Sequence, residues 1–191
     1  MDLFEIHNFA PDALTVRDAV IRGGFTDEIG PDGALYTGIS QYPVPHWPSL
    51  IALALGVTIE PKLTCFRLNL AGELPHSWVH SDGICADYAS VLYLNLPEQC
   101  YGGTAFWRHR ELEIDRIPRK HDLALGAHIT AEWKRLEPWE RTDFVPMEWN
   151  KFVTYPTERF HSRYPFEGFG QGPQDGRLIW ICFYDVSEVK L

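Results

Sequence analysis

His80 and Asp82 stand two residues apart in the stretch Trp78–Asn95, which continues into an apolar, β-branched and aromatic run. On an extended strand, residues i and i+2 project to the same side, so the imidazole and the carboxylate should converge while Ser81 turns away. Imidazole and carboxylate are both common metal ligands. The spacing therefore indicates one half of a metal site, which needs a further ligand from elsewhere in the chain.

The best candidate for the third ligand is His161, in the stretch ERFHSRYPF. Two histidines and one carboxylate on one face of a metal leave the opposite positions open, as in the non-haem Fe(II) oxygenases. The same donors also describe hydrolytic zinc sites, but the sequence has no HExxH motif or obvious partnered glutamate. The spacing of the other nearby histidines suggests no ligand role, so none of these is assigned to metal: His76, His109, His121 and His128.

Arg177 heads the apolar stretch GRLIWICFYD, in which alternation places it on one face with Ile179, Ile181 and Phe183. A guanidinium at the head of an apolar face favours a carboxylate partner in bidentate geometry. That partner is either one of the 26 acidic residues of the chain or a bound ligand. Together with the two histidines and Asp82, Arg177 favours a ligand carboxylate.

The order of these motifs resembles that of the 2-oxoglutarate-dependent Fe(II) dioxygenases, and most closely the prolyl-hydroxylase-like branch. The motifs are HSD, LYLN, YGGTAFW, FHS and GRLIWICFYD, within about residues 62–186. The resemblance implies a double-stranded β-helix with Fe(II) bound by His80, Asp82 and His161. It also implies that the distal carboxylate of 2-oxoglutarate pairs with Arg177 and accepts a hydrogen bond from Tyr93. Tyr93 can serve as a core aromatic residue as well.

One departure from the pattern leaves an alternative open. The loop YPFEGFGQGPQDG makes the stretch between His161 and Arg177 longer than is usual in that branch. Arg163, two residues after His161 and on its face, competes with Arg177 for the co-substrate carboxylate. We expect Arg163 to point toward the substrate instead, although surface solvation is the simpler role for an arginine. The other candidate substrate contacts are Trp78, Trp107 and Arg108.

The chemistry implied by the resemblance is oxidation of an unactivated C–H bond of a small molecule, with O₂ as co-substrate and release of succinate and CO₂. Asp82 fills the position that halogenating members leave open for halide, which favours hydroxylation, desaturation or cyclisation. Two other classes stay open: a non-catalytic jelly-roll module that binds a ligand, and a metal-dependent hydrolase or isomerase of the cupin type.

The elements that must position these residues are mostly strands. Alternation and turn residues predict strands at KLTCFRLNLAG, SWVHSDG, YASVLYLNL, GGTAFWRH, KFVTYPT, RFHSRY and RLIWICFYDV. This pattern predicts a mainly β (α+β) jelly roll, a double-stranded β-helix, over residues 62–186. A helical insert is expected at about residues 121–136, as a packing helix rather than a lid. Short helices within residues 1–60 are expected to buttress the core of what we predict to be a single domain, residues 1–191.

Composition limits the classes of partner. The net charge is −9 and no dense Lys/Arg run exists, which argues against nucleic-acid binding. No apolar stretch approaches the roughly 20 residues of a membrane helix, and the N-terminus does not resemble a signal peptide. The 4 cysteines form no CxxC motif, so reduced thiols and a cytoplasmic location are expected. We expect a small-molecule substrate and no nucleic-acid or membrane partner.

Overall fold

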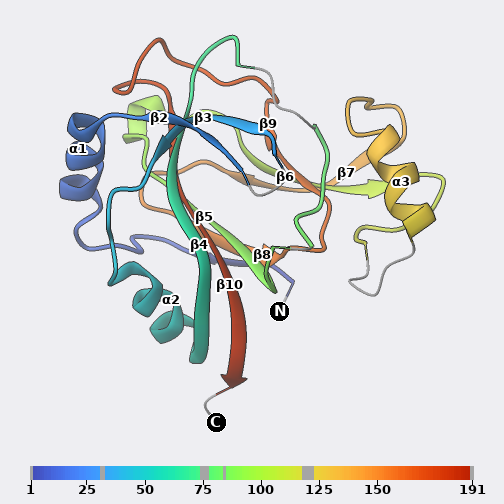
Figure 1. Cartoon of the computed structure of the whole chain (residues 1–191), viewed down its shortest axis with the longest axis horizontal. Coiled ribbons are helices and arrows are strands. Elements are labelled where there is room, and N and C mark those ends of the chain that lie inside the picture. The colour runs from blue at the N-terminus through green and yellow to red at the C-terminus, as the bar shows by residue number, and fades with distance from the viewer. Residues whose placement is uncertain (1, 31–32, 74–77, 84, 118–122, 190–191) are drawn as a thin grey trace.

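The computed structural model describes residues 2–30, 33–73, 78–83, 85–117 and 123–189. Within these ranges the chain is mainly β, with two antiparallel sheets and few helices (Figure 1). The strands are β1 (Phe4–Ile6), β2 (Thr26–Ile29), β3 (Leu35–Ser40), β4 (Val57–Asn69), β5 (Tyr88–Tyr93), β6 (Gly103–His109), β7 (Trp139–Pro146), β8 (Phe152–Pro156), β9 (His161–Tyr164) and β10 (Arg177–Val189). The helices are α1 (Ala13–Gly23), α2 (Trp47–Leu55), α3 (Leu123–Ala131) and a short 3₁₀ turn, Pro97–Gln99.

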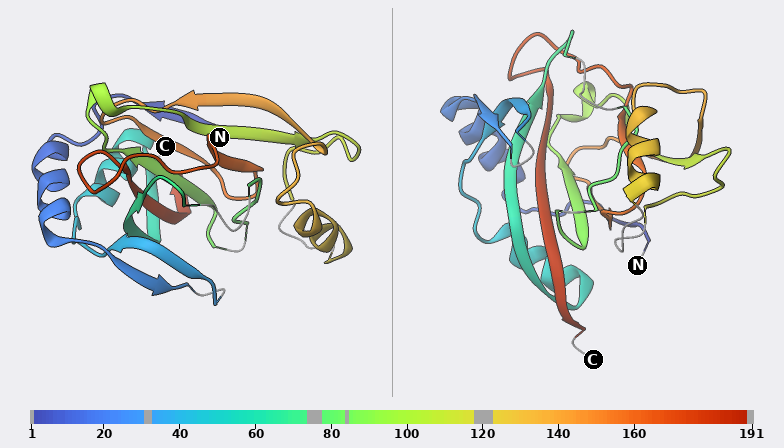
Figure 2. Two further views of the ribbon diagram at one scale, coloured as in Figure 1. Left: turned by 90° about the horizontal axis from the view of Figure 1, so that it is seen from above. Right: turned by 45° about the vertical axis from the view of Figure 1, so that its right-hand side comes forward.

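The larger sheet has seven strands in the order β1-β8-β5-β10-β4-β3-β2, and the smaller has three in the order β7-β6-β9. Alternation along β10 divides the larger sheet into two apolar faces. Leu178 and Trp180 pack with α1 and α2 on the outer face, whereas Ile179 packs with Tyr93 and Phe106 between the sheets. The two N-terminal helices therefore buttress the larger sheet, and its inner face is turned toward the smaller one (Figure 2).

The outer face of the smaller sheet is covered by α3. Ile129 of α3 is fully buried in a third apolar cluster with Trp107, Trp139 and Phe160. In Figure 1, α3 lies at the opposite end of the molecule from α1. The packing role expected for the 121–136 segment agrees with this contact, although residues 121 and 122 lie outside the described ranges.

A glycine pair permits the close approach of the strands in the smaller sheet. A Cβ atom on Gly103 would lie 2.0 Å from the carbonyl oxygen of Val145 on the neighbouring β7. Gly102 has a φ of +71°, and a Cβ there would lie 2.2 Å from the carbonyl oxygen of Tyr164 on β9. Only glycine fits both positions, which lets β6 sit between β7 and β9.

The predicted strands at 62–72, 88–96, 102–109, 151–157, 159–164 and 177–186 all overlap strands of the structure. The stretch SWVHSDG does not form a named strand, and its described part makes one isolated bridge, between His80 and His161. Four strands lie outside the predicted ones: β1, β2, β3 and β7. No helix in the described part of the chain is long and apolar enough to cross a membrane.

Candidate metal centre

Three side chains predicted as metal ligands meet at one place. His161 Nε2 lies 3.1 Å from Asp82 Oδ2, and His80 Nε2 lies 3.8 Å from Asp82 Oδ1. The imidazole rings of His80 and His161 are 4.5 Å apart between centroids. One ligand atom from each residue lies within 4.8 Å of the others, a separation that a single metal ion can bridge.

Backbone hydrogen bonds fix the segment that carries His80 and Asp82. His80 and His161 each donate an N–H to the other's carbonyl oxygen, at 3.1 and 2.9 Å, so the two residues lie directly opposite each other. The Asp82 N–H donates to the carbonyl of Thr157 at 2.8 Å, and the Trp78 N–H donates to that of Trp133 at 2.8 Å. Although it is not a regular strand, the segment is therefore extended and held at both ends.

The protonation states of His80 and Asp82 suit a metal site. Burial, together with the adjacent charge of His161, lowers the pKa of His80 to about 4, so its imidazole is neutral at pH 7. Burial alone would raise the pKa of Asp82, but the charge and hydrogen bond of His161 outweigh it and hold this pKa below its usual value. A neutral imidazole and an anionic carboxylate are the forms that ligate metal ions.

The orientation of His161 leaves its Nε2 available as a metal-ligating atom. Its Nδ1 lies 2.9 Å from the carbonyl oxygen of Arg159, and a carbonyl oxygen only accepts hydrogen bonds. Nδ1 therefore carries a proton, and Nε2, 3.1 Å from Asp82 Oδ2, is the ring nitrogen that could ligate a metal. A hydrogen bond from the second ring nitrogen to a carbonyl is a common support for metal-ligating histidines.

Arg177 is buried on the inner face of the larger sheet, opposite Asn69 in the β4–β10 register. Its Nη1 donates to Asn69 Oδ1 at 3.1 Å, and no carboxylate of the described residues pairs with it. Burial lowers the pKa of Arg177 to about 10. The Tyr93 hydroxyl lies 2.6 Å from Thr104 Oγ1, and burial raises the pKa of Tyr93 to about 12. Arg177 is thus a buried cation whose hydrogen-bond partner among the described residues is a neutral amide.

Two residues near this site were not singled out from the sequence. Tyr155 on β8 is buried with its ring 4.8 Å from that of His161, and burial and the charge of Asp82 raise its pKa well above the usual value. Arg67 on β4 projects from the same face as Asn69 and lies near enough to Arg177 to lower that residue's pKa. Alternation along each strand was the available signal, because it puts both side chains on inward faces.

The candidate substrate contacts lie in different surroundings. Trp78 stacks on Phe166 at 5.1 Å between ring centroids, and both line a cavity of about 390 Å³. Trp107 is buried in the cluster beneath α3, where its Nε1 donates to Ser162 Oγ at 2.9 Å. Arg108 pairs with Glu113 at 3.5 Å. Trp78 is therefore the candidate of these three that borders an open space.

Arg163 is bound by the protein itself. Its Nε donates to the carbonyl of Phe166 at 2.6 Å, and its Nη2 donates to the carbonyl of Glu73 at 2.8 Å. Its Nη1 also lies 3.4 Å from Glu73 Oε1. These contacts fasten the loop after β9 to the turn after β4, and they favour Arg177 over Arg163 as the residue left free for a co-substrate carboxylate.

A second group of potential metal ligands lies beside α3 and has a different chemistry. His109 Nε2 lies 2.7 Å from Glu132 Oε2, and His128 Nε2 lies 3.6 Å from the same oxygen. The Leu112 N–H donates to His109 Nδ1 at 3.2 Å. Nδ1 must then accept, so the proton sits on Nε2 and is donated to Glu132. In this arrangement neither ring nitrogen of His109 has a free lone pair. His76 and His121 lie outside the described residues.

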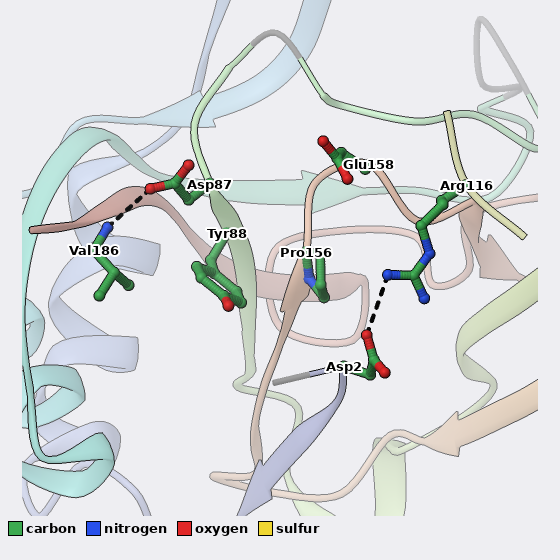
Figure 3. A pocket seen from close by; sticks show the side chains of 7 residues that line it. All are labelled: Asp2, Asp87, Tyr88, Arg116, Pro156, Glu158 and Val186. Carbon is green, nitrogen blue, oxygen red and sulfur yellow. Dashed lines mark hydrogen bonds and ion pairs between the residues drawn. The ribbon is translucent and has the colours of Figure 1, made fainter. Parts of the chain in front are cut away.

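A hollow in another part of the structure contains none of the candidate residues. A cavity of about 420 Å³ is lined by Asp2, Asp87, Tyr88, Arg116, Pro156, Glu158 and Val186 (Figure 3). Arg116 pairs with Asp2 at 3.2 Å, and the Val186 N–H donates to Asp87 Oδ2 at 3.1 Å. The polar groups of this hollow therefore already bind one another.

Comparisons with known proteins agree on the fold. The sequence pattern of a family of unknown function, DUF6445, matches residues 66–184. AviO1 from Streptomyces viridochromogenes Tue57 has a similar structure, with a TM-score of 0.54 and 13% identity over 100% of this chain and 92% of that one. The α-ketoglutarate-dependent carbocyclase SnoK from nogalamycin biosynthesis gives 0.52 and 14%, over 95% and 78%. The epimerase SnoN, solved with Fe³⁺, α-ketoglutarate and nogalamycin RO, gives 0.53 and 15%, over 95% and 78%.

No curated protein matches the sequence. At these identities the structural likeness establishes the fold, which is the double-stranded β-helix of the 2-oxoglutarate oxygenases, and the fold prediction is confirmed.

Proposed function

We propose that this chain, which belongs to the DUF6445 family of unknown function, is a non-haem Fe(II)- and 2-oxoglutarate-dependent oxygenase. The proposal includes oxidation of an unactivated C–H bond of a small-molecule substrate, by hydroxylation, desaturation or cyclisation. The motif order supports a place near the prolyl-hydroxylase-like branch. Similarity in fold to Fe(II)- and 2-oxoglutarate-dependent enzymes supports the class but not the substrate.

The observation that carries the proposal is the convergence of His80, Asp82 and His161 in ligating form. The three donor atoms come from one side, and His161 is held in the tautomer that exposes Nε2 by the carbonyl of Arg159. Two imidazoles and one carboxylate are the donor set of mononuclear Fe(II) oxygenase sites. The residues present therefore fit iron, and these three would hold it.

The co-substrate site is built by the inner face of the larger sheet. Arg177 would pair with the distal carboxylate of 2-oxoglutarate, since a buried guanidinium without an acidic partner favours an anionic ligand. The hydroxyl of Tyr93, which lies close enough to affect the pKa of Arg177, would donate to the same carboxylate. Thr104 holds that hydroxyl in place.

Iron, 2-oxoglutarate and O₂ together would supply the oxidation of the C–H bond, with release of succinate and CO₂. The protein's own part is to orient and shield. Reciprocal backbone bonds between His80 and His161 fix the relative position of the two imidazoles. Tyr155 and Phe106, whose rings lie 5.0 Å apart between the sheets, exclude water from the inner side of the site.

The test is spectroscopic and does not require the substrate. Anaerobic addition of Fe(II) and 2-oxoglutarate should produce a weak visible charge-transfer band in the wild-type protein and none in His161→Ala. A matched control, His128→Ala, should retain the band, because His128 belongs to the second histidine group. A ligand-binding module or a zinc hydrolase of similar fold would give no such band, and its absence from the wild-type protein would end the proposal.

A further inference from the structure

Three arginine side chains from the two sheets give the region around the proposed co-substrate site an excess of positive charge. Arg67 on β4, Arg163 on β9 and Arg177 on β10 lie close enough together that Arg67 and Arg163 each lower the pKa of Arg177. Glu73 is the one carboxylate within 4.0 Å of these arginines in the described ranges of the chain. Two of the three guanidinium groups therefore share one carboxylate, and Arg177 contacts Asn69 instead.

Glu73 already accepts hydrogen bonds from three side chains. Glu73 Oε1 lies 3.3 Å from Arg67 Nη2 and 3.4 Å from Arg163 Nη1. The amide of Asn69 donates to both carboxylate oxygens, at 3.0 and 3.1 Å, while its own oxygen accepts from Arg177. Glu73 thus links Arg67, Arg163 and Asn69, but its single negative charge does not neutralise the three arginines.

The three arginines differ in how much bonding capacity remains. Arg163 uses all three of its nitrogens on Phe166 and Glu73, so it is a structural clamp. Arg177 is assigned to the co-substrate by the proposed function. Among the described residues, Arg67 donates a hydrogen bond to Glu73 through Nη2, and its buried Nε has no hydrogen-bond partner there. Its side chain is 22% exposed and lies over the ring of Tyr36 at 5.1 Å, so the rest of the guanidinium remains reachable.

The charge balance then identifies the missing group. With a divalent metal bound, the metal and three arginines are opposed by Asp82 and Glu73, which leaves three positive charges. A 2-oxoglutarate dianion neutralises two of them and leaves one. A partly buried excess cation is costly unless it is paired. We infer that the substrate is an organic anion and that Arg67 pairs with its carboxylate or phosphate; this inference rests on the proposed function.

Anion binding at Arg67 can be measured with simple probes. The melting temperature of protein loaded with Mn(II) and saturating 2-oxoglutarate would be followed while acetate or inorganic phosphate is added at constant ionic strength. Acetamide serves as the neutral counterpart of acetate. We expect a rise of roughly 3 °C at ten times the dissociation constant of the anion, and none with acetamide. A response to acetate alone indicates a carboxylate substrate, and one to phosphate alone a phosphorylated substrate.

Variants locate the response. Arg67→Gln should lose the rise, and Arg67→Lys should keep part of it, which separates loss of charge from a folding defect. Arg116→Gln changes a partly exposed arginine paired with Asp2 and Asp115; it is the matched control and should respond like the wild-type protein. Arg177→Gln should still respond to the anion while losing stabilisation by 2-oxoglutarate.

Three results would overturn the inference: no response in the wild-type protein, an unchanged response in Arg67→Gln, or loss of the response in Arg177→Gln but not in Arg67→Gln. A protein stabilised by acetate through Arg67, but not by 2-oxoglutarate, would instead contradict the proposed function and leave the anion site in place. The two failures are therefore distinguishable.

Discussion

Two groups of histidine and carboxylate side chains lie in the described part of this protein, and they differ in whether Nδ1 of the buried histidine donates a hydrogen bond to the backbone or accepts one from it. Between the sheets, Nδ1 of His161 donates a hydrogen bond to the carbonyl oxygen of Arg159, which leaves Nε2 as the nitrogen that can ligate a metal. Beside α3, Nδ1 of His109 accepts a hydrogen bond from the N–H of Leu112. The proton of His109 is therefore on Nε2, which donates to Glu132. Residue types and separations alone make the groups look alike, whereas the tautomers make one a potential metal site and the other a hydrogen-bonded support.

The surroundings reinforce the contrast. His109 is buried with its ring 5.0 Å from that of Trp139, and Glu132 also receives Arg135 at 3.5 Å. Its carboxylate is therefore paired within the protein. Asp82, by comparison, has the two histidines as its ion-pair partners in the described part of the chain, and these are the other prospective ligands. A metal can replace the contacts of Asp82 without leaving another cation unpaired.

The largest expected effect is on metal binding. Asp82→Ala removes the one anionic ligand and should weaken Co(II) or Fe(II) binding by more than about 100-fold, or about 3 kcal/mol, and abolish succinate formation. Isothermal titration with Co(II) measures the affinity. Glu132→Gln is the matched control in the other group and should bind one equivalent with wild-type affinity. Full turnover by Asp82→Ala, or loss of the metal in Glu132→Gln, would reverse the assignment of the two groups.

The next effect is on stability. His109→Ala deletes a buried ring that bonds to Glu132 and contacts Trp139, so the free energy of unfolding should fall by about 2–3 kcal/mol. Urea denaturation measures this change. Metal affinity in the folded variant should stay at the wild-type value. If His109→Ala lost the metal while remaining folded, the group beside α3 would be a binding site after all.

A smaller effect separates co-substrate binding from metal binding. Arg177→Gln removes the buried guanidinium and should raise the concentration of 2-oxoglutarate needed for half-saturation by roughly 10- to 30-fold, or about 1.4–2 kcal/mol. Titration of the charge-transfer band gives this value directly. Co(II) affinity should not change, since Arg177 contacts Asn69 rather than a ligand histidine. Arg163→Gln is the comparison, and a larger shift in that variant would exchange the two roles.

Local rules predict the geometry of one half of the candidate metal centre. The side-chain period of an extended chain brings His80 and Asp82 to one side, and the structure has this geometry although the segment forms no regular strand. The pairing with His161 is a contact between distant segments, which no local rule supplies. It was anticipated through the family resemblance, and the structure places the three side chains together.

Other features of the site and the fold could not be predicted from the sequence, because they depend on strand register and on contacts made by turn residues. The sequence around Glu73 indicates only a turn, yet its carboxylate pairs with Arg67 and Arg163 and accepts a hydrogen bond from Asn69. The alignment of Asn69 with Arg177 follows from the β4–β10 register, which sequence periodicity does not fix. The unpredicted β7 has an almost wholly exposed run between Trp139 and Val145, so it lacks the apolar alternation that marked the other strands.

The smallest expected effect concerns pH. The hydrogen bond from His109, followed by the charges around it, holds the pKa of Glu132 below its usual value of 4.5, despite an opposing effect of burial. A carboxyl whose pKa is lower in the folded state stabilises the fold above its unfolded pKa, because the unfolded chain binds more protons below that point. The wild-type protein should therefore lose about 1 kcal/mol as pH falls below about 4.5.

Glu132→Gln should lack this component of the acid-induced loss. The check is a pair of urea denaturation series between pH 3 and pH 7, with the difference between the two proteins plotted against pH. Identical curves for both would mean that the ion pairs around Glu132 contribute nothing to stability. The group beside α3 would then owe its place to packing around His109 alone, and the contrast with the metal centre would rest on tautomers without an electrostatic component.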